Sequence, residues 1–188
     1  METGSIQRAT GARALSSVIE TERLALRQLT IDDVDAMFAI MGDAETMKHY
    51  PRPFSREDTA AWVNKNLERY RRDGFSLYAV TLKTNDSDVI GDCGLMRQEV
   101  EGDSLIEVGY HFRRDCWGQG YATEAAKGCM TYGFKHLGAS KVVSLIRAEN
   151  VPSRRVAERN GMTIERQVIF HDLPHLLYAM RRGDYGQA

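Results

Sequence analysis

One segment of the sequence, residues 104–138, constrains the fold more than any other. It starts with SLIEVGYHF, whose composition predicts a strand, and continues into a turn that contains Gly118 and Gly120. A helix is predicted directly after the turn, with one apolar face marked by Ala125, Met130 and Phe134. The segment therefore predicts a strand, a glycine turn and a helix in immediate succession.

The glycine turn has the chemistry of an anion site. Gly118 and Gly120 let the backbone turn tightly and approach a ligand, and the next residues open a helix whose first N–H groups have no partner within the helix. Arg113, Arg114 and Gln119 stand beside the turn. The spacing is neither GxGxxG nor GxxxxGK[ST], so the dinucleotide and P-loop motifs both fit poorly. A tight turn with no ligand is the alternative interpretation.

The remaining elements follow from apolar spacing and from cap and turn residues. Two helices are predicted before the glycine turn, at 30–43 and 55–74, and one after it, at 152–161. Strands are predicted at 20–29, 75–82, 89–100, 104–112, 141–150, 162–170 and 175–182.

Composition limits the class of protein. The 188 residues include 25 basic and 26 acidic side chains, so no global field favours nucleic acid or an anionic membrane. Three cysteines without a CxxC pair argue against a disulfide framework and against a zinc site, and no metal is expected. We expect a cytoplasmic protein with no membrane segment, with a flexible leader at 1–18 and a single domain at 19–184.

An ordered series of motifs resembles the GNAT superfamily of N-acetyltransferases, and within it the RimJ/RimL-like branch. The series comprises ETERLALRQL, DAETMKHYPRPFSREDTAAWV, VIGDCGL, IEVGYHF, WGQGYATEAA and Asn150 with PSRRVAERNGM. Two positions depart from the family pattern. Asp115 stands where Gln or Arg is common, and Ala157 stands where many members carry a tyrosine that protonates the leaving thiolate.

The resemblance implies an α/β (α+β) fold. One mixed, strongly bent sheet of about six to seven strands would be flanked by about four helices, and two strands would splay apart to hold acetyl-CoA. The cofactor-binding residues implied in this way are Phe112, Arg113, Arg114, Trp117, Gly118, Gln119, Gly120, Tyr121, Ala122, Thr123, Asn150, Ser153 and Arg155.

Acetyl transfer to an amine needs a base for the amine, a donor for the thioester carbonyl and a proton for the thiolate. Glu107 is the candidate base, with a structural carboxylate as the alternative. A backbone N–H near Phe112 would polarise the carbonyl. His111 and Tyr178 are further catalytic candidates, each with a structural role as the alternative.

The acceptor is less constrained. The resemblance favours the α-amine of a protein or peptide, with a polyamine, an amino acid or an aminoglycoside-like antibiotic as alternatives. A CoA-binding regulatory module without turnover is the alternative outside enzymology. We expect a monomer or a homodimer. The candidate substrate residues are Met47, Tyr50, Glu107 and Tyr110.

Overall fold

A computed structural model describes residues 16–186 of the chain. Its helices are η1 (Ile31–Asp33), α1 (Val34–Met41), α2 (Arg56–Asp73), η2 (Arg114–Cys116), α3 (Tyr121–Lys135) and α4 (Val151–Arg159). Its strands are β1 (Ser17–Glu20), β2 (Leu24–Gln28), β3 (Leu77–Leu82), β4 (Asn85–Val100), β5 (Asp103–Phe112), β6 (Lys141–Ile146), β7 (Thr163–Phe170) and β8 (Leu173–Arg181).

The strands form one mixed sheet in the order β1-β2-β3-β4-β5-β6-β8-β7. The α+β class and the single bent sheet are confirmed, but the described residues contain eight strands where about six to seven were predicted. The additional strand is β1, which begins in the predicted leader and forms a hairpin with β2, the strand that matches the prediction at 20–29. Thr21 N–H donates to Leu24 O at 3.0 Å and closes the turn of that hairpin.

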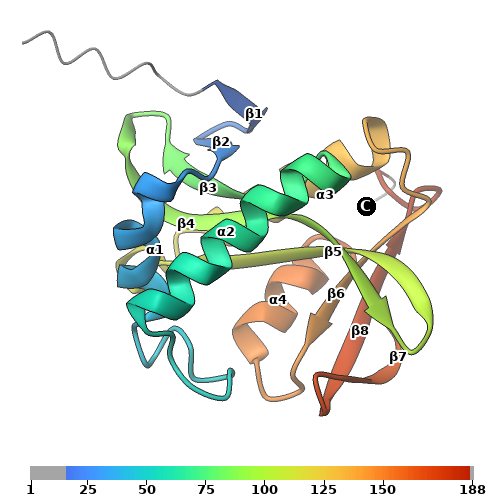
Figure 1. The fold of residues 1–188 in the computed structure, drawn as a ribbon. Coiled ribbons are helices and arrows are strands. Elements are labelled where there is room, and N and C mark those ends of the chain that lie inside the picture. Colours follow the sequence, from blue (N-terminus) through green and yellow to red (C-terminus); the bar gives the residue numbers. More distant parts are fainter. Residues whose placement is uncertain (1–15, 187–188) are drawn as a thin grey trace, which may run out of the picture.

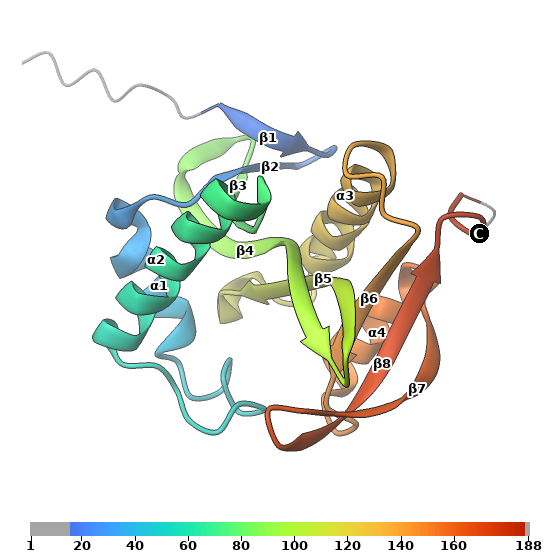
Figure 2. The same ribbon diagram turned by 45° about the vertical axis from the view of Figure 1, so that its right-hand side comes forward.

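The centre of the sheet is split between β5 and β6. These strands are parallel, and they pair in register only at Glu107 and Val143, whereas β4 and β5 stay paired from Gly91–Phe112 to Val100–Asp103. Figure 2 shows β5 and β6 running apart beyond this point. The predicted splayed pair is therefore present, and one edge of β5 has no neighbouring strand near Phe112.

Helices cover the two faces of the sheet in separate groups (Figures 1 and 2). Helices α1 and α2 pack on one face through a cluster that includes Met37, Ile40 and Val63. Helices α3 and α4 pack on the other face, where Met130 and Ala157 belong to a larger cluster. Since the helices end close to the split, their termini and the loops before them form its walls.

The cap residues of α2 fix the start of that helix. Ser55 Oγ accepts from Asp58 N–H at 3.1 Å, and the Asp58 carboxylate accepts from Ser55 N–H at 2.8 Å, as the sequence S-x-x-D predicts. Gly74 ends the helix with a φ of 81°, which glycine adopts without strain. Helix α2 is thereby held alongside β4 and β5, over the residues discussed below.

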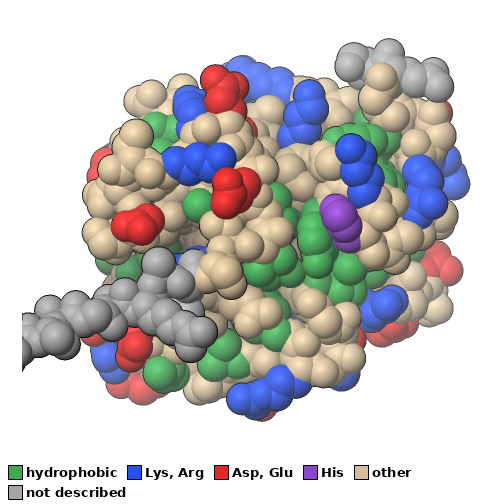
Figure 3. All heavy atoms as spheres, turned by 90° about the horizontal axis from the view of Figure 1, so that it is seen from above, with side chains coloured by type: hydrophobic (Ala, Val, Ile, Leu, Met, Phe, Trp, Pro, Cys, Tyr) green, Lys and Arg blue, Asp and Glu red, His purple; other side chains and the backbone are tan. Residues whose placement is uncertain are grey.

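The ends and the surface add three observations. Of the predicted leader, residues 1–15 lie outside the described part, and Ser17 and Val18 belong to β1. No helix in residues 16–186 is long and apolar enough to span a membrane. On the face seen in Figure 3, acidic and basic side chains are both present, with apolar side chains between them.

Candidate active site

Two adjoining cavities open where β5 and β6 separate. The first, called the loop cavity, has a volume of about 470 Å³ and lies between residues 117–123 and the start of α4. The second, called the central cavity, has a volume of about 420 Å³ and lies between α2, β5 and the β7–β8 turn. The cavities meet at a junction lined by His49, Tyr50, Tyr110, His111, Asn150 and Ser153. The two cavities therefore adjoin one another at these residues.

The glycine turn forms one wall of the loop cavity. Gly118 and Gly120 have φ values of 76° and 81°, in the left-handed region that favours glycine. Glu124 N–H donates to Gly120 O at 3.0 Å and is the first internal bond of α3, so the amides before it are free to bind a ligand. Glu124 itself is held by Arg23, whose Nε lies 2.6 Å from the carboxylate. The acidic residue of this turn therefore does not add negative charge to the cavity.

The start of α4 forms the opposite wall. Asn150 caps the helix, because its side-chain oxygen accepts from Ser153 N–H at 3.2 Å. The cap uses only the oxygen of the amide group, so the amide nitrogen can donate to a ligand. The cationic side chains that line this cavity are Arg155 and Arg159, which belong to α4, and Lys48, which forms an ion pair with Glu45. Free amides on one wall and cations on the other suit a polyanion.

The free edge of β5 connects the cavities. Ser144 Oγ donates to Val108 O at 3.1 Å, so the backbone groups of residue 108 point toward β6. Strand alternation gives Tyr110 and Phe112 the same direction. Phe112 O accepts from Trp117 Nε1 at 2.8 Å, which leaves its N–H as the polar backbone group facing the gap.

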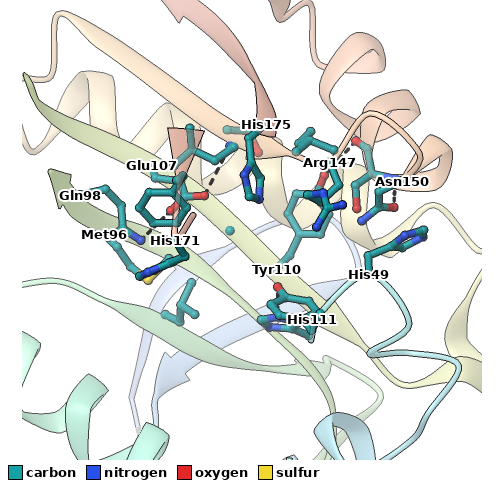
Figure 4. Close-up of a pocket in the computed structure, with 18 of the residues that line it drawn as sticks. His49, Met96, Gln98, Glu107, Tyr110, His111, Arg147, Asn150, His171 and His175 are labelled. Carbon is teal, nitrogen blue, oxygen red and sulfur yellow. Dashed lines mark hydrogen bonds between the residues drawn. The ribbon is translucent and has the colours of Figure 1, made fainter. Parts of the chain in front are cut away.

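Glu107 lies in the central cavity and is only 8% exposed. Its carboxylate accepts from Gln98 Nε2 at 2.8 Å and from the N–H of Leu145 at 3.4 Å (Figure 4). Burial raises the pKa of Glu107, while these two hydrogen bonds and the charge of Arg69 oppose the increase. A carboxyl group whose pKa is raised is a stronger base than an ordinary carboxylate.

A hydrogen-bonded chain of three side chains ends at the junction. Asp92 is fully buried, and its carboxylate lies 2.9 Å from His111 Nδ1 and accepts from His111 N–H at 2.7 Å. His111 Nε2 lies 2.7 Å from the Tyr50 hydroxyl. Burial lowers the pKa of His111, but Tyr50 and Asp92 raise it more, to about 10. His111 is therefore protonated at neutral pH and donates to both neighbours.

Comparison with known proteins identifies the family. Residues 23–163 match the family model described as an acetyltransferase (GNAT) domain. This chain belongs to the GNAT acetyltransferase family. It is 33% identical over 159 residues to the uncharacterised protein YkkB of Bacillus subtilis, covering 84% of this chain and 92% of that protein. It is 32% identical over 148 residues to the uncharacterised N-acetyltransferase YnaD of the same organism, covering 78% and 83%.

Solved structures agree with this assignment. A GNAT-family acetyltransferase from Bacillus anthracis superposes with a TM-score of 0.75 at 28% identity, covering 88% of this chain and 98% of that one. The chain is thus an acyl-CoA-dependent N-acetyltransferase whose cofactor is acetyl-CoA, as the sequence predicted.

More distant acetyltransferases share the fold alone. RimL, described as a ribosomal L7/L12 α-N-protein acetyltransferase, superposes with a TM-score of 0.67 at 19% identity. An aminoglycoside acetyltransferase in complex with coenzyme A superposes with a TM-score of 0.72 at 13% identity. Because both kinds of enzyme use this fold, it does not identify the acceptor of this acetyltransferase.

The structure brings most of the expected cofactor residues to the loop cavity. Three of them do not line it: Arg113, Arg114 and Gln119. Arg113 donates from Nη1 to Asp88 at 2.7 Å and from Nε to Asp115 at 2.8 Å, and its N–H donates to Ile90 O. Both its side chain and its amide therefore have partners already. Arg113 faces two carboxylates, so this cluster keeps one net negative charge, but neither Asp88 nor Asp115 lines the loop cavity.

Tyr178, a catalytic candidate from the sequence, lies in the predicted strand but does not reach either cavity. It lines neither of the two cavities, is 1% exposed and belongs to the core. Its hydroxyl donates to Glu158 at 2.8 Å and accepts from Arg154 Nε at 3.0 Å. Helix α4 covers this tyrosine, so its hydroxyl cannot reach an acetyltransferase substrate in the central cavity.

The four candidate acceptor residues all line the central cavity: Met47, Tyr50, Glu107 and Tyr110. Met47 is buried and supports the wall through the apolar cluster below α1. Tyr110 donates its hydroxyl to Ser153 O at 3.1 Å, and burial raises its pKa, so it remains a neutral side chain.

Sequence reasoning missed Asp92, Lys65 and Arg69. Asp92 had a usable signal, because VIGDCGL places one acid within an otherwise apolar strand. Such a residue is buried only with a partner. Lys65 and Arg69 resemble the other basic residues of α2 in sequence, and only their packing beside β4 and β5 places them in the central cavity.

Proposed function

We propose that this acetyltransferase transfers the acetyl group from acetyl-CoA directly to the α-amine of a protein or peptide, as the RimJ/RimL-like branch does. The observation that carries the proposal is the junction of the two cavities beside the free edge of β5. In this scheme the loop cavity binds acetyl-CoA and the central cavity binds the acceptor.

The residues of the loop cavity fit the cofactor. The amides of 118–123 at the start of α3 would hold the pyrophosphate, with Arg155 and Arg159 as counter-charges. The backbone groups of Tyr110 and Phe112 that face the gap would pair with the pantetheine arm. Acetyl-CoA supplies the activated acetyl group, and the Phe112 N–H would donate to its carbonyl oxygen.

Glu107 serves as the base. At pH 7 an α-amine with a pKa of about 7.7 to 8 loses its proton at a cost of about 1 kcal/mol, whereas a lysine amine costs about 4 to 5 kcal/mol. A carboxylate is a weak base, so it suits the α-amine better. Glu107 is five residues from Phe112, about 17 Å along the strand, so it takes the proton through a chain of waters in the central cavity.

Tyr50, His111 and Asp92 serve as the acid. The Tyr50 hydroxyl donates its proton to the departing thiolate and takes a proton from His111 Nε2. Asp92 holds His111 protonated and oriented. These three side chains therefore supply, from another part of the fold, the proton that many family members take from a tyrosine at the position of Ala157. His111 then regains its proton from solvent.

Removing the Tyr50 hydroxyl tests whether Tyr50, His111 and Asp92 supply the acid. We expect Tyr50→Phe to lower kcat at pH 7 by about tenfold or more, because a positioned acid contributes at least that factor. The affinity for acetyl-CoA should stay within about twofold, since the ring is retained. Stopped-flow thiol detection measures the rate. An unchanged kcat with an unchanged pH profile would remove Tyr50 from the mechanism.

Charge removal tests the cofactor site. We expect Arg155→Gln to weaken acetyl-CoA binding by about threefold to tenfold, and less at high salt, because phosphate contacts are screened. Arg114→Gln is the matched control, since Arg114 lies beside the glycine turn but outside the cavity. Calorimetry measures both. If Arg114→Gln had the larger effect, the loop cavity would not be the cofactor site.

The acceptor class is tested by mass spectrometry of products. A peptide with a free α-amine and an internal lysine is incubated with acetyl-CoA, beside the same peptide blocked at its α-amine. We expect acetylation of the first at the α-amine and none of the second. Acetylation of polyamines or aminoglycosides but of neither peptide would replace the peptide acceptor by a small molecule.

A further inference from the structure

The central cavity is positively charged, although the chain as a whole is nearly neutral. Its lining includes the cations Lys65, Arg69 and Arg147, of which Arg147 pairs with Glu149, and Glu107 is the single carboxylate among its described lining residues. Burial raises the pKa of that carboxylate, which reduces its negative charge at lower pH. His111 at the junction pairs with the buried Asp92 carboxylate, so this pair adds no net charge there. This environment disfavours an acceptor that carries only cationic groups.

Arg69 is the most informative of these cations. Its side chain is half-buried, and its closest polar contact is the thioether of Met96, with Nη1 3.1 Å from Sδ. No carboxylate of the described residues lies within 4.0 Å of its guanidinium. Burial and the charge of Arg72 lower the pKa of Arg69, and the charges of Glu107 and Asp73 oppose this decrease. A guanidinium placed in this way favours a bound carboxylate.

Lys65 extends the cationic site. It lies four residues before Arg69 on α2, so both side chains are on one face of the helix. Lys65 also forms no ion pair within the described residues, whereas Arg56 and Arg72 on the same helix pair with Asp35 and Asp73. Lys65 and Arg69, which face the central cavity, are thus among the cations of α2 that have no acidic partner in the described residues.

The distance of Lys65 and Arg69 from the junction sets how far the acceptor's carboxylate lies from its amine. Trp62 packs edge-on against His111, with ring centroids 6.2 Å apart, so this turn of α2 is level with the junction. Lys65 and Arg69 lie roughly 5 and 10 Å further along the helix, at a rise of about 1.5 Å per residue. An extended peptide advances about 3.3 to 3.6 Å per residue, so this distance corresponds to its first three residues.

We propose that the acceptor amine carries a carboxylate that Lys65 and Arg69 bind, as in a peptide with Asp or Glu among its first three residues. This inference rests on the proposed function and adds the substrate class to it. The amine lies toward the junction, and the carboxylate lies toward Arg69. A free dicarboxylic amino acid has the same chemistry at a shorter spacing.

The test compares matched peptides that differ only by Glu or Gln at the second residue. We expect kcat/KM for the acidic peptide to exceed that for its partner by about tenfold or more, and Arg69→Gln to abolish the difference. Arg69→Lys should retain part of the preference, because it keeps the charge. Arg71→Gln is the matched control, since it is exposed on the same helix and lines neither cavity.

The outcomes separate the two proposals. Equal kcat/KM for both peptides in the wild type would overturn the carboxylate site and leave peptide acetylation intact. Turnover of neither peptide, with acetyl-CoA still bound, would overturn the peptide acceptor. Free glutamate as a better substrate, with the same loss in Arg69→Gln, would support the carboxylate site with a small-molecule acceptor. Lys65→Gln, at an exposed position, repeats the test if Arg69→Gln does not fold.

Discussion

Glu107→Gln should lower kcat at pH 7 by at least about 100-fold, because an amide cannot accept the proton of the amine. Acetyl-CoA affinity should not change, since Glu107 lies outside the loop cavity. Glu99→Gln on the same hairpin is the matched control, because Glu99 is exposed and lines neither cavity. Single-turnover thiol release measures the rate of the chemical step.

Glu107 also links β5 to β6 through Leu145 N–H, so a structural effect must be separated from a chemical one. Activity should rise with pH as Glu107 ionises. The hydrogen bond from Gln98 lowers the pKa of Glu107. Gln98→Ala removes this bond, so the rise of activity with pH should move to higher pH in that variant. If Glu107→Gln lost stability in urea but kept its kcat, the carboxylate would be structural.

Asp92→Asn should reduce both stability and turnover at pH 7. The pKa of His111 is raised to about 10 in the folded protein, well above its unfolded value of about 6.5. The stabilisation is therefore complete below about pH 6.5 and is lost as the pH rises through about 10. The shift corresponds to a few kcal/mol at about 1.4 kcal/mol per pKa unit, and Asp92 contributes only part of it, because Tyr50 raises the same pKa.

Urea unfolding at pH 6.5 and pH 10.5 measures this effect. The wild type should lose stability between these values by more than Asp92→Asn, and a histidine NMR titration should show a lower pKa for His111 in the variant. The kcat of the variant should fall as its imidazolium loses the proton. Equal pH dependence of unfolding in both proteins would show that Asp92 does not hold His111 protonated.

Features encoded within a few residues were predictable from the sequence. The loop with Gly118 and Gly120 needs left-handed backbone angles that glycine supplies, and Asn150 followed by a proline is a local helix start. Glu107 was a candidate from its place in the strand IEVGYHF. All of these lie where the sequence placed them, at the walls of the two cavities.

Features that depend on distant pairing were not predictable. Arg113 stands beside the loop in sequence but pairs with Asp88, which is 25 residues away. Asp92 meets His111 only because β4 and β5 pair in that register. Tyr178 alternates correctly along its strand, yet α4 covers it. At such positions tertiary packing decides which way a side chain points, so the local sequence alone does not predict it.

The central claim is that this protein transfers acetyl from acetyl-CoA to an α-amine at the junction of the two cavities. Acceptor-dependent release of free CoA thiol by the purified protein, with a panel of peptides that includes acidic N-termini, tests it most directly. We predict thiol release in equal amount to acetylated peptide, and its loss in Glu107→Gln. Binding of acetyl-CoA without thiol release for any peptide in the panel would contradict it.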